Sequence, residues 1–245
     1  MIIGISGKAG AGKDLAGKII QFLIDREESK YSHPINEEFF EVYARKFDQK
    51  YCDWRIVKFA DKLKDIVGII LGCTRKKLED REFKDSPLPK QWNNIVKETN
   101  KVKASIRAYR EHSLTPREIL QKLGTDVCRA IHPNTWINAT MNDYDPSPLA
   151  AYHTDYKNLV PNWIITDVRF PNEADTVVEK GGFLIRINRP GYGTSMYALA
   201  NDHESETALD AYNFDIVISN DGTITDLISK IYEVLVQKGI IHGIC

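Results

Sequence analysis

The stretch MIIGISGKAGAGKDLAG, residues 1–17, decides the fold of this chain. Residues 2–5 are apolar and predict a short buried strand that leads into a glycine-rich turn. Gly7, Gly12 and Lys13 fit the pattern G-x-x-x-x-G-K, in which a turn holds phosphates at the start of a helix. Glycines allow a close backbone approach, and the N–H groups of the turn and of the helix N-terminus attract an anion. The sequence therefore predicts a nucleotide-phosphate site directly after the first strand.

The composition limits which classes of protein fit. The chain has 245 residues, of which 42% are hydrophobic and 27% charged, enough for one sizeable core with a subdomain. A net charge of −1 lacks the basic footprint of a protein that coats nucleic acid. No apolar run reaches transmembrane length. The four widely spaced cysteines are typical of reduced thiols, so we expect a cytoplasmic protein.

Apolar segments alternate with amphipathic helical segments along the chain. The expected strands are residues 2–6, 55–59, 163–167, 183–188 and 214–219. Alternation of this kind predicts an α/β fold with a parallel sheet and right-handed crossovers. We expect the first strand, which carries the glycine-rich turn, to be central in this five-stranded sheet.

Charged residues at the carboxyl ends of the expected strands are candidate ligand contacts, because ligands collect at that edge of a parallel sheet. The strand at residues 163–167 ends in Asp167, as the carboxylate strand of a phosphate-loop enzyme does. Arg169 shares a face with Asp167 while the chain stays extended, and a buried ion pair between them is the alternative. Lys64 follows the second strand, and a solvated surface position is its alternative.

Residues 74–112 are the most cation-rich part of the chain, and only Arg81 is singled out from them. A cation-rich insertion suits an anionic substrate, although a solvated helical subdomain explains most of these charges. Thr115 and Pro116 then predict a helix start that Glu118 closes with a capping box. Arg117 lies in the first turn of that helix, where the helix dipole disfavours a cation, which suggests another role.

The motifs GKAGAGKD, FADKLKD, PREILQKLGTD, ITDVRFPNEAD, INRPG, DHESE and ISNDGT occur in this order. Together with the Arg81-Glu82 pair and Trp136 they resemble the phage-encoded deoxynucleoside monophosphate kinases. The resemblance is weakest at residues 26–54, 84–112 and 143–160. It implies a three-layer phosphate-loop fold like that of nucleoside monophosphate kinases, and transfer of the γ-phosphoryl group of ATP to a deoxynucleoside monophosphate.

The resemblance also implies one kinase domain over residues 1–245, with a helical substrate-binding insertion at about 74–145 and a lid-like segment at about 190–213. It places ATP at Gly7, Lys8, Ala9, Gly10, Ala11, Gly12, Lys13, Asp14 and Leu15. It places the deoxynucleoside monophosphate at Leu63, Lys64, Arg81, Arg117, Gly124, Thr125, Trp136, Asp167, Arg169 and Glu173. Trp136 fits either a core position or a wall that stacks on a base. Leu15 departs from the family, whose members tend to carry Thr or Ser there.

The mechanism expected for this family needs alignment and charge compensation. The expected catalytic residues are Lys13, Asp14, Arg117, Asp167 and Arg169. Asp14 or Asp167 would coordinate Mg²⁺, directly or through water. Lys8, Arg81, Arg117 and Arg169 would clamp the phosphates, because residues 191–213 contain no Lys or Arg.

Two other functions remain open at this point. One is a kinase for another small phosphorylated metabolite, such as a phosphomevalonate-like substrate. The other is a non-catalytic nucleotide-binding switch. A nucleic-acid polymer and a membrane are not expected as partners. Kinases of the resembled type are often dimers, and the sequence leaves a homodimer open.

Overall fold

The computed structural model describes residues 1–28, 34–46, 53–100, 105–144, 161–191 and 204–243. These residues form two compact units. The first unit consists of Met1–Phe59 and Thr140–Cys245, and the second unit is Ala60–Ala139. Among the described residues, no helix combines the length and the apolar character needed to cross a membrane.

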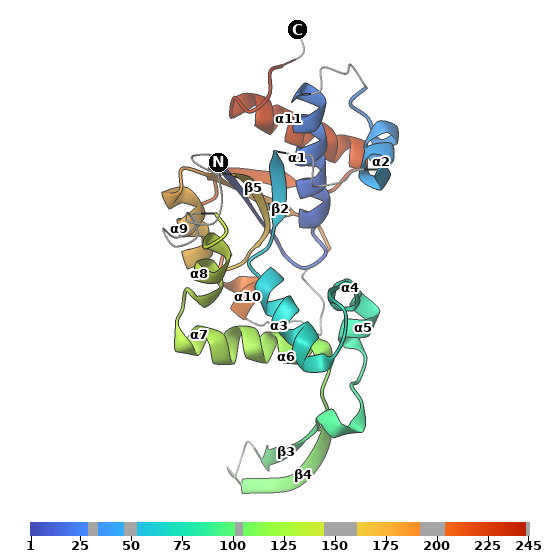
Figure 1. Cartoon of the computed structure of the whole chain (residues 1–245), viewed down its shortest axis with the longest axis vertical. Coiled ribbons are helices and arrows are strands. Elements are labelled where there is room, and N and C mark those ends of the chain that lie inside the picture. The colour runs from blue at the N-terminus through green and yellow to red at the C-terminus, as the bar shows by residue number, and fades with distance from the viewer. Residues whose placement is uncertain (29–33, 47–52, 101–104, 145–160, 192–203, 244–245) are drawn as a thin grey trace, which may run out of the picture. The chain divides into compact units, whose positions relative to one another are not determined.

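The first unit is built on a five-stranded parallel sheet (Figure 1). Its strands are β1 (Ile2–Ser6), β2 (Trp54–Val57), β5 (Asn162–Val168), β6 (Phe183–Asn188) and β7 (Ile216–Ser219). They lie in the order β2-β5-β1-β6-β7, which confirms that the first strand is central. Every residue of β1 is buried, because strands lie on both sides of it and helices cover both faces. The glycine-rich turn therefore leaves from the middle of the sheet, at the carboxyl edge.

Helices on both faces complete the three layers of the first unit (Figure 1). They are α1 (Lys13–Glu28), α2 (Glu37–Lys46), α9 (Pro171–Glu179), α10 (Glu204–Thr207) and α11 (Ile224–Gln237). Ile3 and Ile5 point toward α1 and α11, where they share a core with Ile20 and Ile231. Gly4 points to the opposite face, where a Cβ atom would meet Val177 of α9 at 3.2 Å. The alternation along β1 thus supplies both helical layers, and the predicted fold class is confirmed.

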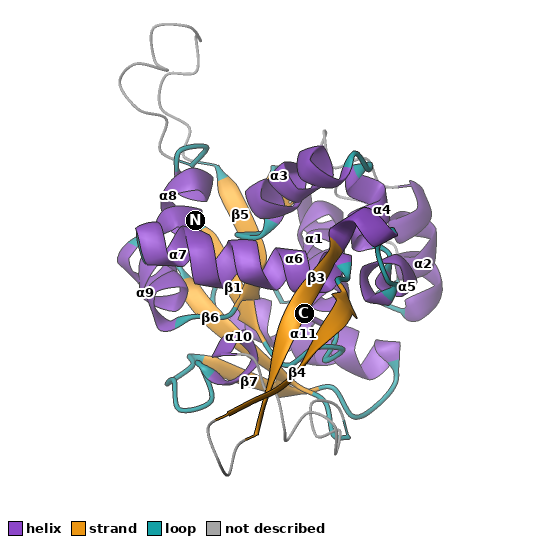
Figure 2. Ribbon diagram, turned by 90° about the horizontal axis from the view of Figure 1, so that it is seen from below, coloured by secondary structure: helices purple, strands orange, loops and turns teal. Residues whose placement is uncertain are grey.

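The second unit combines short helices with a β-hairpin. Its elements are α3 (Asp61–Leu71), α4 (Arg75–Glu79), α5 (Arg81–Asp85), a 3-10 turn (Lys90–Trp92), β3 (Asn93–Asn100), β4 (Ser105–Ser113), α6 (Pro116–Gln121), a π-helical turn (Lys122–Val127), α7 (Cys128–Ile131) and α8 (Thr135–Met141), which crosses the unit boundary. Strands β3 and β4 are antiparallel and lie side by side (Figure 2). This hairpin lies within the segment expected to be a helical insertion, and its many charged residues hid the strand pattern.

The helix that begins at Pro116 shows one confirmed feature and one difference. Thr115 caps it, and its hydroxyl and backbone N–H pair with the backbone and carboxylate of Glu118, so the predicted capping box is confirmed. Glycine disfavours a helix, but this helix does not stop at Gly124. The chain passes through the π-helical turn and continues into α7. Wider turns of this kind are frequent at functional sites.

Candidate phosphate-binding site and cation cluster

The turn after β1 has the backbone that a phosphate loop requires. Gly7 and Gly12 have φ values of 155° and 99°, which side chains rarely adopt. A Cβ atom at Gly7 would lie 2.4 Å from the carbonyl oxygen of Ile187, and one at Gly12 would lie 2.6 Å from Asn220 Nδ2. Asn220 Nδ2 also donates a hydrogen bond to the carbonyl of Ala11 at 2.9 Å. The loop is therefore fixed against the carboxyl ends of β6 and β7.

Lys13 lies folded over this loop. Its Nζ donates hydrogen bonds to the carbonyl oxygens of Gly7 at 2.7 Å and Lys8 at 2.9 Å. Burial, and then repulsion from Arg169, lower the pKa of Lys13 to about 8, despite nearby carboxylates that raise it. A buried ammonium whose charge is disfavoured gains from an anionic ligand, so the arrangement of the loop and Lys13 suits an anion.

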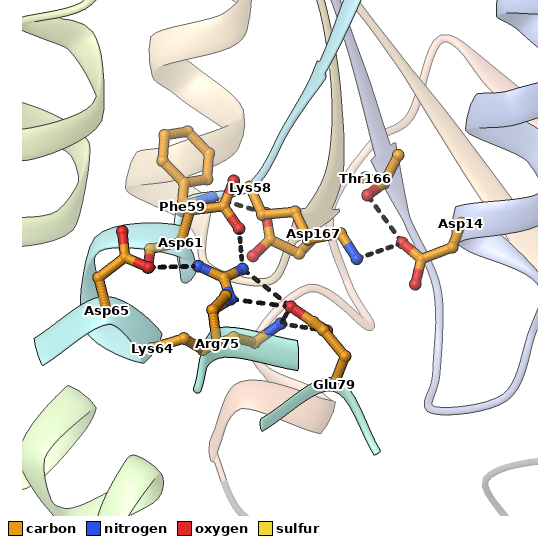
Figure 3. Close-up of polar contacts among 10 residues, drawn as sticks. All are labelled: Asp14, Lys58, Phe59, Asp61, Lys64, Asp65, Arg75, Glu79, Thr166 and Asp167. Atoms are coloured by element: carbon orange, nitrogen blue, oxygen red, sulfur yellow. Dashed lines mark hydrogen bonds and ion pairs between the residues drawn. The ribbon is translucent and has the colours of Figure 1, made fainter. Parts of the chain in front are cut away.

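Asp14 lies in the first turn of α1, beside the loop, and contacts one residue of β5 and one residue that follows β2 (Figure 3). Thr166 Oγ1 of β5 donates to Asp14 Oδ1 at 2.9 Å, and Lys58 Nζ, after β2, lies 2.8 Å from the same oxygen. Burial raises the pKa of Asp14, but the contacts with Lys58 and Thr166 outweigh it and hold the pKa below its usual value. Asp14 is therefore an ionised carboxylate beside the loop. The next residue, Leu15, packs against the core, so the hydroxyl beside Asp14 comes from Thr166.

The residues expected after β5 take separate roles. Asp167 Oδ1 accepts the backbone N–H of Phe59 at 2.8 Å, which ties the ends of β2 and β5 together (Figure 3). The carboxylate of Glu173 accepts the N–H groups of Arg169 at 2.8 Å and Phe170 at 3.2 Å, so it caps the start of α9. The guanidinium of Arg169 pairs with Glu206, in place of the Asp167 pair that its spacing suggested.

An acidic segment around α10 contacts the phosphate loop. Glu206 Oε2 accepts the backbone N–H of Ala9 at 3.0 Å. Lys8 Nζ donates to the backbone carbonyl of Glu206 at 2.5 Å and to Asp210 Oδ2 at 2.7 Å. Asp210 Oδ1 also accepts Arg186 Nη2 at 3.0 Å. This segment lies within the expected lid at 190–213, of which residues 192–203 fall outside the described chain.

The second unit holds two of its expected phosphate ligands in ion pairs. Lys64 Nζ donates to both carboxylate oxygens of Glu79, at 2.9 and 2.8 Å (Figure 3). Arg75 contacts the carboxylates of Asp61, Asp65 and Glu79 and so braces α3 against α4. Arg117 donates to Asp85 through Nε at 2.5 Å and Nη2 at 3.2 Å. Each of these expected ligands is thus fixed in position by a carboxylate.

Lys84 is the cation that the sequence reasoning did not single out. Burial lowers its pKa, and repulsion from Lys64 and Arg117 lowers it further. Within the described part of the chain, no acceptor pairs with its ammonium group. Arg81 and Lys84 both act electrostatically on Asp85, so they belong to the same group of charges. We call Lys64, Arg81, Lys84 and Arg117 the cation cluster. Lys84 follows Arg81 by three residues, the helical spacing that would have indicated it.

Three of the expected acceptor contacts lie together, namely Leu63, Gly124 and Trp136. Thr125 lies half-buried in the π-helical turn. The indole Nε1 of Trp136 donates to the carbonyl of Gly124 at 2.8 Å. A Cβ atom at Gly124 would lie 2.8 Å from Leu63 Cδ2, so α3 packs closely on this turn. Trp136 is 5% exposed, which favours the core role for most of its surface.

Comparison with known proteins gives consistent results. The model of the family described as deoxynucleotide monophosphate kinase matches residues 1–231. A protein of Acanthamoeba polyphaga mimivirus, provisionally named as such a kinase, is 37% identical over 48% of this chain and 59% of its own. The deoxynucleotide monophosphate kinase of Enterobacteria phage T4 is 27% identical over 64% of this chain and 56% of its own. The deoxynucleotide monophosphate kinase of Escherichia phage RB69 is 29% identical over 49% of this chain and 44% of its own.

The chain spans about half the length of these relatives. The family match covers the phosphate loop, the cation cluster and the strand that bears Asp167. The chain belongs to the deoxynucleotide monophosphate kinase family.

Proposed function

We propose that this protein transfers the γ-phosphoryl group of ATP to a deoxynucleoside 5′-monophosphate and so forms ADP and a deoxynucleoside diphosphate. The observation that carries the proposal is that one member of this family has both a glycine-rich loop with a buried lysine and a separate group of clustered cations. One is the phosphate loop with Lys13 in the first unit. The other is the cation cluster of the second unit. A kinase that acts on a phosphorylated acceptor must hold two phosphate groups at once.

The loop residues, Gly7 to Leu15, are the proposed ATP site. The backbone N–H groups of the loop and Lys13 would hold the outer phosphates. Arg169 lies close enough to Lys13 to lower its pKa, so its charge is at the loop. We propose that Arg169 neutralises negative charge on the phosphoryl group in the transition state of its transfer.

The residues beside the loop fit a magnesium ion. Among the described residues, no group of three or more His, Cys, Asp and Glu side chains could hold a metal by itself. Magnesium requires less, because it is commonly bound by one or two carboxylates together with waters and substrate phosphates. The carboxylate of Asp14 and the hydroxyl of Thr166 supply such oxygen atoms. Asp14 directly follows the loop in the sequence, whereas Asp167 accepts the N–H of Phe59. Bound there, Mg²⁺ would neutralise charge on the phosphates.

The cation cluster is the proposed site of the acceptor phosphate, and the second unit is the proposed substrate-binding insertion. Lys64 and Arg117 are held in place by Glu79 and Asp85, whereas Lys84 has its ammonium group available. Leu63, Gly124, Thr125 and Trp136 are the proposed surroundings of the nucleoside, and Thr125 offers a hydroxyl to a base edge. An ionised acceptor phosphate is itself the nucleophile, so no strong general base is needed.

A coupled assay of ADP release tests the proposal. The acceptors are dAMP, dCMP, dGMP, dTMP, their ribose forms and phosphomevalonate, each with ATP and magnesium. Turnover with one or more deoxynucleoside monophosphates is the expected result, and the pattern gives the base range. Turnover with phosphomevalonate alone would indicate a kinase for a non-nucleotide phosphorylated metabolite. ATP binding without turnover of any acceptor would favour a nucleotide-binding switch.

A further inference from the structure

The phosphate loop of this chain already holds an anion, which is its own Glu206. One oxygen of the Glu206 carboxylate accepts the N–H of Ala9, and the other pairs with Arg169. Backbone N–H groups of a phosphate loop are the donors that nucleotide phosphates use. Glu206 therefore occupies one backbone donor of the proposed ATP site and also the guanidinium of Arg169, which we assign to the transferred phosphoryl group.

Contacts of the Glu206 backbone and of the nearby Asp210 also hold this segment against the loop. Lys8 Nζ donates to the carbonyl oxygen of Glu206 at 2.5 Å. Four residues later, Asp210 binds the same Lys8 Nζ at 2.7 Å and Arg186 at 3.0 Å. Burial raises the pKa of Glu206, but Arg169, the Ala9 N–H and Lys13 outweigh it, so the carboxylate is ionised. Contacts of its side chain, its backbone carbonyl and the neighbouring Asp210 thus fix Glu206 beside the loop.

Two anions cannot share the same N–H group, and their charges repel at short range. If an ATP phosphate binds the N–H of Ala9, it must therefore displace the Glu206 carboxylate from that N–H. Arg169 would be released in the same step, since its guanidinium pairs with Glu206.

We propose that Glu206 is an internal competitor of ATP, whose carboxylate binds at the phosphate loop and is exchanged for nucleotide phosphate. The inference rests on the proposed function in one respect, that the loop binds ATP. In this exchange, Arg169 leaves its ion pair with Glu206 and pairs with the incoming phosphate. Its positive charge is therefore balanced by an anion both before and after ATP binds. Glu206 thus weakens ATP binding and keeps Arg169 at the loop.

The test compares the nucleotide affinity of the full chain with that of Glu206→Gln. The neutral amide keeps the size of the side chain and loses the charge that holds Arg169. We expect ATP and inorganic tripolyphosphate to bind Glu206→Gln about tenfold more tightly in isothermal titration calorimetry, a gain of about 1.4 kcal/mol. The gain is expected for both ligands, because the competition concerns phosphate and not the base. Glu204→Gln, an exposed position on the same short helix, is the matched control and should bind as the unaltered chain does.

A second variant guards against a folding defect in Glu206→Gln. Glu206→Asp keeps the charge but shortens the side chain, so its carboxylate withdraws from the Ala9 N–H and ATP should again bind more tightly. Unchanged or weaker binding of ATP by folded Glu206→Gln and Glu206→Asp would overturn the competition and leave the ATP site standing. Absence of ATP and tripolyphosphate binding in every variant and in the unaltered chain would overturn the ATP site and the competition together.

Discussion

Arg117 donates to the Asp85 carboxylate through Nε and Nη2, at 2.5 and 3.2 Å, and thereby joins the first turn of α6 to the last residue of α5. The contact explains how a cation is tolerated at a helix N-terminus. Both side chains are substantially exposed, at 43% and 48%, and exposed ion pairs add little to stability. The pair is better suited to aiming the guanidinium than to holding the fold.

The first prediction follows from this exposure. Arg117→Ala should reduce turnover by about 100-fold or more, the scale of a lost transition-state contact, with little change in the unfolding midpoint. Asp85→Asn, which removes the partner and keeps the cation, should retain most of the activity. Steady-state kinetics and thermal unfolding of the two variants check this. Equal losses of activity in both would assign the pair a structural role.

The second prediction concerns Lys84. Replacement by Met should raise the KM for the deoxynucleoside monophosphate about 10- to 100-fold, because a charge-assisted hydrogen bond contributes about 1.5–3 kcal/mol. The KM for ATP should stay nearly constant, since the loop is untouched. Lys76→Met, an exposed position on α4, is the control. An unaltered acceptor KM in Lys84→Met would remove this lysine from the phosphate site.

The third prediction concerns Asp14 as the nearer magnesium ligand. Asp14→Asn keeps an acceptor for Thr166 and loses the charge, so turnover should fall by about 100-fold or more, and a higher magnesium concentration should be needed for half-maximal rate. Asp25→Asn, near the far end of the same helix, is the control. Rates measured across a magnesium titration decide the matter. A similar loss in Asp167→Asn with none in Asp14→Asn would transfer the role to Asp167.

The fourth prediction concerns pH and the capping box. Burial raises the pKa of Glu118, but His112, at 2.7 Å, and Thr115 outweigh it and lower the pKa below 4.5. A depressed carboxyl pKa stabilises the fold above the unfolded value of 4.5, and this contribution is lost as the pH falls through the folded value. Glu118→Gln should therefore be less stable than the unaltered chain at pH 6. The difference should shrink as the pH falls below about 4.5.

Denaturant unfolding at several pH values checks this prediction. Thr115→Ala, which removes the other half of the box, should lower the free energy of unfolding by about 1 kcal/mol. A stability difference between Glu118→Gln and the unaltered chain that is constant from pH 6 to pH 3 would contradict the assignment.

Local patterns in the sequence determined a large part of the fold. Residues 1–17 specify a strand, a glycine turn and a helix, because the apolar run and the backbone freedom of glycine act over a few residues. The five strands and the central place of β1 follow from the alternation of strand and helix. Thr115, Pro116 and Glu118 begin a helix through contacts within four residues. The β3–β4 hairpin was not predicted, because its many charged residues obscure the alternation of apolar and polar residues that indicates a strand.

The tertiary structure alone decided how the charges pair. Asp14 meets Lys58 and Thr166 because β2 and β5 end beside the loop, although Thr166 is 152 residues away in the chain. Arg169 pairs with Glu206 instead of Asp167, and Glu206 reaches Ala9 across 197 residues. Electrostatic contacts depend on distance in space, which sequence spacing does not encode once the chain leaves a single helix or strand. The sequence by itself therefore determined the phosphate loop, and only the folded chain decided which carboxylate occupies it.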